Sequence, residues 1–179
     1  ASDATFYALT GGATNLKAQK NRQSLPLSYI KNNDVVTYDS LSNTLIVSDL
    51  RLTCILESAY PSSKAPEKIT ALGHEFPVLE SAWTSTPNFN VGSQVTLLLT
   101  ADGKVAGMAE PGKVPSTAIG MVSQGSAQVF LPNGGTLDLK GEVSRADELA
   151  NRLVTITSGA KGKIGASPLP SKSASGAFQ

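Results

Sequence analysis

A stretch of twelve residues occurs three times in this chain, and it constrains the fold more than any other feature. The copies begin with Val-Thr at Val36, Val95 and Val154, and successive copies lie 59 residues apart. They align without a gap as VTYDSLSNTLIV, VTLLLTADGKVA and VTITSGAKGKIG. A fixed period of this length indicates a tandem array of small units. Such arrays more often serve as spacers or binding surfaces than as single-site enzymes.

Each copy has the chemistry of a β-hairpin, with Val, Thr, Leu and Ile favouring half-buried strands on both sides of a turn. Asp102-Gly103 in the middle copy is a strong hairpin signal, because both residues tolerate positive φ. Thr44 does not adopt positive φ readily, so we expect a longer loop in the first copy. The predicted turn residues of the three hairpins are Asn43, Asp102, Gly103, Lys161 and Gly162.

Further elements are predicted upstream of each hairpin. A short helix or loop precedes it at residues 24–30, 81–89 and 144–150, with one apolar plug each in Ile30, Phe89 and Leu149. In the second copy we expect a strand at residues 52–57 and then a hairpin around Gly73-His74, with Gly73 as a turn residue. The third copy has matching segments, and residues 6–9 are the predicted first strand of the first copy.

The order of strand, hairpin, short helix and hairpin is that of a five-stranded OB-type barrel, with an SH3-like barrel as the alternative. We therefore predict an all-β chain of tandem small OB-like or SH3-like β-barrel modules with short connecting helices. The modules are residues 1–49, 50–110 and 116–167, followed by a flexible tail or linker at 168–179. The first is shortest upstream, so an incomplete module is one interpretation of it. It has almost no linker to the second, so we expect these two to abut.

Composition excludes several classes of function. Charged residues make up 16% of the chain and the net charge is +1, so no global field would recruit nucleic acid. No run of about 18 apolar residues occurs, so no membrane span is predicted. Cys54 is the only cysteine, which rules out an internal disulfide and leaves the compartment open.

The segments NDVVTYDSLSNTLIVSD, SAYPSSKAPEKITALGHEFPVLESA and FNVGSQVTLLLTADGKVAGM resemble the repeat region of clostridial-type surface proteins that carry S-layer homology domains elsewhere. The resemblance covers roughly residues 33–108. It implies export and a place at the cell wall or cell surface, as a structural segment whose partners are the other domains of the same protein.

Catalytic chemistry has few candidate residues. His74 is the only histidine, so a Ser-His-Asp triad or a histidine metal site would need it, and no Walker or dinucleotide motif occurs. We therefore predict no catalytic, metal or cofactor-binding residues and no enzyme activity. Trp83 and Tyr60 are the residues we would expect in any ligand contact. The alternative function is thus an OB-like module that binds cell-wall polysaccharide or a protein.

Overall fold

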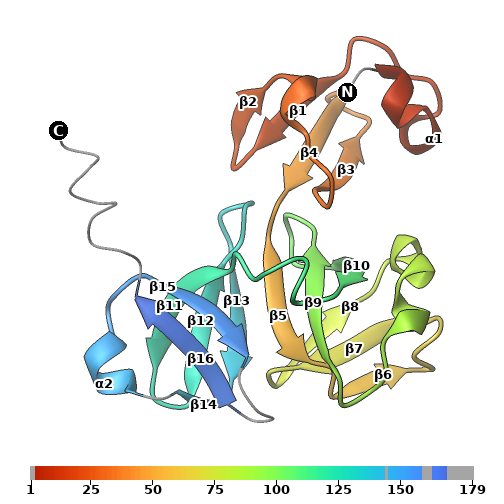
Figure 1. The fold of residues 1–179 in the computed structure, drawn as a ribbon. Coiled ribbons are helices and arrows are strands. Elements are labelled where there is room, and N and C mark those ends of the chain that lie inside the picture. The colour runs from red at the N-terminus through yellow and green to blue at the C-terminus, as the bar shows by residue number, and fades with distance from the viewer. Residues whose placement is uncertain (1–2, 144, 159–162, 169–179) are drawn as a thin grey trace, which may run out of the picture.

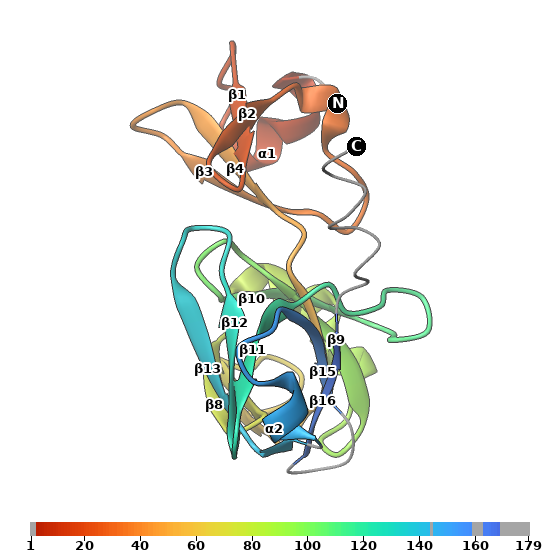
Figure 2. The ribbon, with the colours of Figure 1, turned by 90° about the vertical axis from the view of Figure 1, so that its left-hand side faces the viewer.

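The protein forms three β-rich units, of which the first stands apart from the other two (Figures 1 and 2). The computed structural model describes residues 3–143, 145–158 and 163–168. We call residues 3–48 the first unit, 51–109 the second unit and 116–168 the third unit, and we call the second and third together the body. Strands are the main element in each unit, which confirms the predicted all-β class.

The first unit is a single mixed sheet with strand order β2-β1-β4-β3. Its strands are β1 (Lys17–Lys20), β2 (Gln23–Leu25), β3 (Val35–Asp39) and β4 (Thr44–Ser48), and its helices are η1 (Asp3–Phe6), α1 (Tyr7–Thr10) and η2 (Leu27–Tyr29). β1 and β4 pair in parallel, and the other neighbours are antiparallel. The prediction of a strand at residues 6–9 is wrong, because these residues are helical. Gly11 ends the helix with a φ of 74° and donates its N–H to Tyr7 O at 2.8 Å, a left-handed cap that glycine favours.

The second unit contains two three-stranded sheets, with orders β10-β9-β5 and β6-β7-β8. Its strands are β5 (Arg51–Ile55), β6 (Ser58–Tyr60), β7 (Lys68–Ala71), β8 (His74–Pro77), β9 (Gln94–Leu99) and β10 (Val105–Ala109). The helices η3 (Glu80–Thr84) and η4 (Thr86–Asn88) precede the β9–β10 hairpin, where the sequence predicted a helix or loop.

The third unit is one sheet with order β13-β12-β11-β15-β16-β14. Its strands are β11 (Ile119–Ser123), β12 (Ser126–Phe130), β13 (Thr136–Lys140), β14 (Glu142–Val143), β15 (Val154–Ser158) and β16 (Lys163–Pro168), and its helix is α2 (Ala146–Leu149). The repeated stretch is thus an antiparallel hairpin in all three units, as β3–β4, β9–β10 and β15–β16.

The prediction of closed barrels is not met, because the sheets of the described residues remain open. The second unit shows the physical reason. The N–H of Leu56 donates to Ser93 O at 3.0 Å, whereas the next N–H, of Glu57, donates to Thr70 O at 2.9 Å. Consecutive residues therefore bond to different sheets, and the chain turns from β5 into β6 at this point. In the third unit, Gly141 separates β13 from β14, which lie at opposite ends of the same open sheet.

The hairpin turns depend on residues that accept positive φ. In the first unit, Asp39 pairs with Thr44 across a four-residue loop that ends at Asn43 with a φ of 53°. In the second unit, Gly103 has a φ of 85° and its N–H donates to Thr100 O at 3.0 Å. This is a type I turn followed by a left-handed glycine. Asp102 is not left-handed, so the turn differs from a two-residue Asp-Gly turn.

The described residues form two hydrophobic cores. The first unit has a small core in which Leu16, Ala18, Leu45 and Val47 are buried, with Ile30 packed against them. One continuous core runs through the second and third units, from Phe76 and Leu97 to Leu139 and Ile156. Phe89 packs against this larger core and Leu149 is part of it, so all three predicted plugs lie against a core.

Candidate functional site

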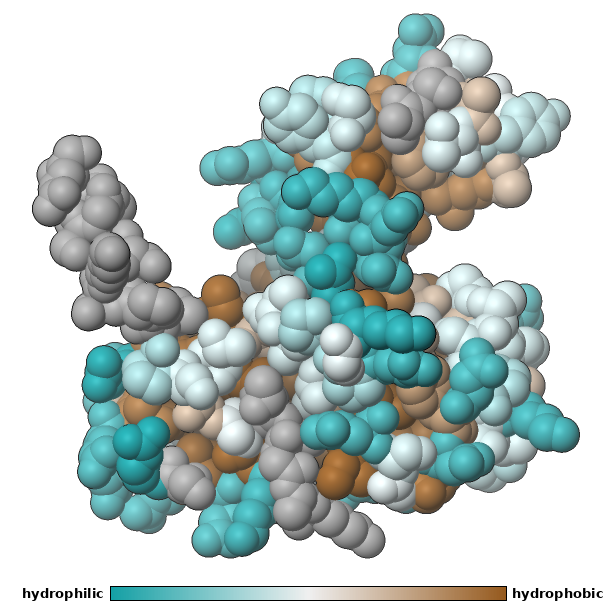
Figure 3. All heavy atoms as spheres, in the orientation of Figure 1, coloured by the Kyte–Doolittle hydropathy of each residue, from teal (hydrophilic) through white to brown (hydrophobic). Residues whose placement is uncertain are grey.

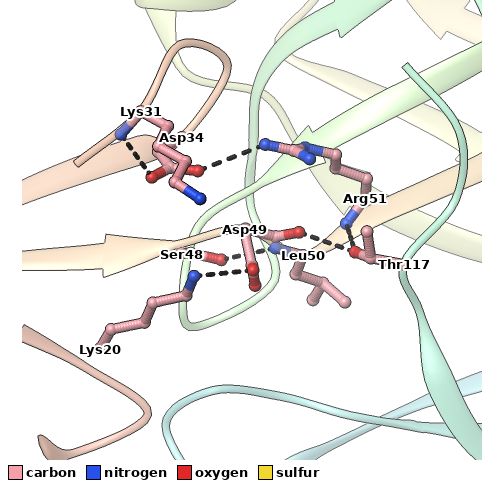
Figure 4. Close-up of polar contacts among 8 residues, drawn as sticks. All are labelled: Lys20, Lys31, Asp34, Ser48, Asp49, Leu50, Arg51 and Thr117. Atoms are coloured by element: carbon pink, nitrogen blue, oxygen red, sulfur yellow. Dashed lines mark hydrogen bonds and ion pairs between the residues drawn. The ribbon is translucent and has the colours of Figure 1, made fainter. Parts of the chain in front are cut away.

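The short connection from β4 to β5 makes several hydrogen bonds and ion pairs, and we call it the joint (Figure 4). It consists of Ser48, Asp49, Leu50 and Arg51. Thr117 of the third unit accepts a hydrogen bond from Arg51 N at 2.9 Å and donates its hydroxyl to Asp49 O at 2.7 Å. The N–H of Leu50 donates to Ser48 Oγ at 3.2 Å. Three consecutive residues of the connection are therefore held by defined partners.

Two ion pairs join the joint to the first unit. Arg51 Nη2 lies 3.3 Å from Asp34 Oδ1, and the two side chains are only 19% and 5% exposed. The other Asp34 oxygen accepts the N–H of Lys31 at 2.9 Å. Lys20 Nζ lies 2.8 Å from Asp49 Oδ2 in a more exposed pair. Because Asp34 is buried with its charge, its contact with Arg51 is the stronger constraint on the angle between the units.

The second and third units also meet through backbone contacts beside the joint. Arg51 O accepts the N–H groups of Thr117 and Ala118 at 2.8 and 3.1 Å. The Ser116 hydroxyl donates to Arg51 O at 3.0 Å and lies 2.8 Å from Ile156 O. The segment that enters the third unit is thereby bonded to the first strand of the second unit.

A cavity of about 370 Å³ lies beside the joint, between the sheet of the first unit and two turns of the body. Its polar lining includes Gln19, Asn21, Arg22, Asp102 and Asn133. Asp102 is already occupied, because its carboxylate accepts the Thr100 hydroxyl and lies 3.6 Å from Lys104 Nζ. The cavity therefore offers amides, a guanidinium and the hydroxyl of Thr37 for hydrogen bonding.

Trp83 and Tyr60, the predicted ligand residues, both contact the loop of residues 61–67. Trp83 Nε1 donates to Pro66 O at 2.8 Å, and the ring is half-buried. The indole thus fixes the loop. Tyr60 is 61% exposed, and Lys68 Nζ lies 5.3 Å from the centre of its ring. Of the two residues, Tyr60 is the one whose side chain is accessible to a ligand.

His74 and Cys54 have structural contacts. His74 Nδ1 lies 3.0 Å from Asp138 O of the third unit, and its ring packs edge-on against Phe76 at 4.6 Å. Cys54 is fully buried. Burial, with a smaller contribution from Glu57, raises the pKa of the Cys54 thiol to about 12. A neutral thiol without solvent access is a poor nucleophile.

Two of the predicted turn glycines lie at the contact between the second and third units, a role the sequence did not suggest. Gly73 follows Leu72 in a two-residue turn in which both have positive φ, so the turn lies one residue earlier than predicted. A Cβ on Gly73 would lie 2.8 Å from Lys140 Cβ, and one on Gly103 would lie 3.1 Å from Leu137 Cδ1. Lys161 and Gly162 lie outside the described residues.

Arg51 of the joint and its partners Asp34 and Thr117 were also not found from the sequence. The available signal was the lack of a linker at residues 49–50, which indicated that the first two units abut. It did not indicate the partners. Among the residues that the structure describes, there is no group of three His, Cys, Asp or Glu side chains arranged to hold a metal ion. No helix in the described part of the chain has the length and apolar character needed to cross a membrane.

Comparison with protein-family models, with curated proteins and with solved structures gave no significant match.

Proposed function

We propose that this chain is a structural spacer segment of a bacterial cell-surface protein, associated with an S-layer and located outside the cell at the wall. The observation that carries the proposal is the joint. Its backbone is bonded across the units and its buried ion pair fixes the first unit to the body. A spacer needs units that keep a fixed order and direction, and these contacts provide such a constraint.

We further propose that the units are OB-like modules with the boundaries predicted from the sequence. Support comes from a parallel contact that recurs in all three. Gln19 pairs in parallel with Ile46 in the first unit, and Val78 with Val105 in the second. Both residues of the second pair lie 59 positions after those of the first, which is the period of the sequence. In the third unit, Val143 pairs in parallel with Ile164, which lies 59 positions after Val105.

The antiparallel pairs of the second and third units also agree with this topology. β5 pairs with β9, and β11 pairs with β15. In both of these units the first strand therefore lies beside the first strand of the repeated hairpin. A meander of three strands followed by this hairpin is the order expected of an OB-like unit.

Small-angle X-ray scattering of the full chain tests the spacer proposal. A single compact domain of this length has a radius of gyration of about 16 Å. We expect a clearly larger value and a distance distribution with a shoulder from the separate first unit. A value near 16 Å with a symmetric distribution would contradict the proposal. Antibody labelling of intact cells of the source organism tests the location, and labelling only after permeabilisation would contradict it.

The accessible Tyr60 favours one second candidate, binding of a wall polysaccharide, since exposed aromatic rings can stack on sugars. Pull-down with purified wall polymer, comparing Tyr60→Ala with Tyr29→Ala, tests it. Tyr29 is similarly exposed, at 65%, but lies in the first unit. Loss of binding in Tyr60→Ala alone supports this function. Equal binding by both variants, or no binding by the wild type, removes it.

A further inference from the structure

The outer edge of β3 in the first unit has no neighbouring strand among the described residues, because β3 is the last strand of its sheet. The corresponding strands of the other two units are flanked on this side. β5 covers the outer edge of β9, and β11 covers that of β15.

The backbone of β3 presents hydrogen-bonding groups on this edge. Val35, Thr37 and Asp39 alternate with Val36 and Tyr38 along the strand. In the second unit the residues equivalent to Val36 and Tyr38 are Val95 and Leu97, which pair with Cys54 and Leu52 of β5. Leu99 has the same parity and donates its N–H to Leu50 O on that side. The N–H and C=O groups of Val36 and Tyr38 therefore point outward, away from β4.

The side chains of β3 are also less buried than the equivalent side chains of β9. Val95 and Leu97 are 0% exposed, whereas Val36 and Tyr38 are only half-buried. Both pack against the small core of the first unit, so a further strand would cover their side chains. Figure 3 shows hydrophobic surface on the first unit at the side where β3 lies in Figure 1.

The edge also lacks the usual protection against pairing. Natural edge strands commonly carry lysine, proline or a bulge that prevents another strand from adding to the sheet. β3 has the sequence Val-Val-Thr-Tyr-Asp and pairs with β4 in an unbroken register. It has neither lysine nor proline and its only charge is at the end next to the turn.

We propose that the outer edge of β3 binds an extended strand of another polypeptide, which adds antiparallel and has the apolar alternation of β5. The proposed pairing has the same geometry as the pairing of β5 with β9 in the second unit, so β5 is the template for the bound strand. Apolar side chains at the positions of Leu52 and Cys54 would face the core of the first unit. The backbone groups of these two residues would bond to Val36 and Tyr38. This mode of binding is β-augmentation, in which backbone bonds supply affinity and alternate side chains supply specificity.

The test uses the full chain and a labelled peptide with the sequence of residues 50–57, with Cys54→Ala to keep that position apolar and a soluble lysine tag. We expect saturable one-to-one binding, with NMR shift changes at the amides of Val36 and Tyr38 and none at Val95 and Leu97. N-methylation of the peptide at the positions that correspond to Leu52 and Cys54 should weaken binding at least tenfold, because it removes the N–H groups that face the edge. N-methylation at the position of Thr53, whose N–H points away, is the matched control and should change affinity less than threefold.

The peptide experiment would overturn the proposal by an absence of saturable binding, by equal weakening with both methylation patterns, or by shift changes that map to other strands. Light scattering of the chain alone tests whether a second copy of the chain occupies the edge. If the chain dimerises with protection of Val36 and Tyr38 amides, the edge pairs with its own copy and the proposed occupant is wrong.

Discussion

Replacing Gly73 by alanine tests whether the turn glycine is needed for the contact between the second and third units. Gly73 has a φ of +68°, and a Cβ there would lie 2.8 Å from Lys140 Cβ. Gly125 is the matched control. It has a φ of +74° in another two-residue hairpin turn, and no atom lies within 4 Å of its Cβ position. Both variants place alanine in the left-handed region, so both lose about 1 kcal/mol of stability for that reason.

The additional loss in Gly73→Ala comes from the contact with the third unit. Carbon atoms in contact prefer about 3.5–4.0 Å, so the two units must separate by nearly an ångström at this point. Lys140 O and Cα also lie within 3.6 Å of the new Cβ, so rotation of a side chain cannot relieve the clash. The hydrogen bond from Lys140 N to Leu72 O, now 2.8 Å, would lengthen. Overpacking of this kind costs about 1–3 kcal/mol, so we expect a total loss of about 3 kcal/mol.

Thermal unfolding followed by circular dichroism measures this difference. In a chain of this length 1 kcal/mol lowers the midpoint by about 2–4 °C, so Gly73→Ala should lose about 6–12 °C and Gly125→Ala about 2–4 °C. Hydrogen exchange at Lys140 N–H should become faster in Gly73→Ala alone. Equal shifts in the two variants, with unchanged exchange at Lys140, would refute the claim that close approach at Gly73 holds the units together.

Three further predictions concern the joint, the loop and the buried thiol. Asp34→Asn should lower the free energy of unfolding by about 2 kcal/mol in denaturant, since a nearly buried charge pair loses one partner. Lys20→Met, which breaks the more exposed pair, should lower it by less than about 1 kcal/mol. Equal losses would show that burial of Asp34 is unimportant. Trp83→Phe should lower the free energy of unfolding by about 1–2 kcal/mol and speed proteolysis of the 61–67 loop, because the buried Pro66 carbonyl loses its hydrogen-bond donor. An unchanged cleavage rate would contradict the role of Trp83 in holding this loop. Cys54 should react with a thiol reagent at pH 8 only after unfolding. Because its pKa is raised from 9.0 to about 12, the stability that it contributes is complete below pH 9 and declines as the pH rises toward 12. Cys54→Ala should remove that part of the alkaline dependence, and rapid labelling of the folded chain would contradict the burial.

The hairpins were predictable because their signals are local. Alternating β-branched residues and one residue suited to positive φ specify each of them, and Thr44 indicated the longer loop in the first unit. The plugs Ile30, Phe89 and Leu149 were predictable from the same repeat. Their positions relative to the hairpin fix which side chain meets the core.

The sheet boundaries and the joint could not be derived in this way. The change of sheet between Leu56 and Glu57 depends on where Ser93 and Thr70 lie in the fold, and neither is near in sequence. Asp34 and Arg51 come together because β3 and β4 pair Val35 with Ser48, which places Asp34 beside the start of the joint. Thr117 reaches the joint from another unit. The helix at residues 7–10 was missed because residues 6–9 are a short apolar run, which is ambiguous between a strand and a helix. In the structure Gly11 caps the segment as a helix.

The parallel pairing of β1 with β4 has a mechanical consequence. β1 is the first strand of the first unit and β4 is its last strand, and their residues pair from Lys17–Thr44 to Lys20–Val47. Tension applied to the two ends of the unit would pull these strands in opposite directions along their length. The hydrogen bonds between them would then carry the load together, whereas a hairpin pulled from its open end loses its bonds one after another. Resistance to extension is a kinetic property set by the rate of unfolding, so the smallest unit of the chain has the geometry to yield slowly under force.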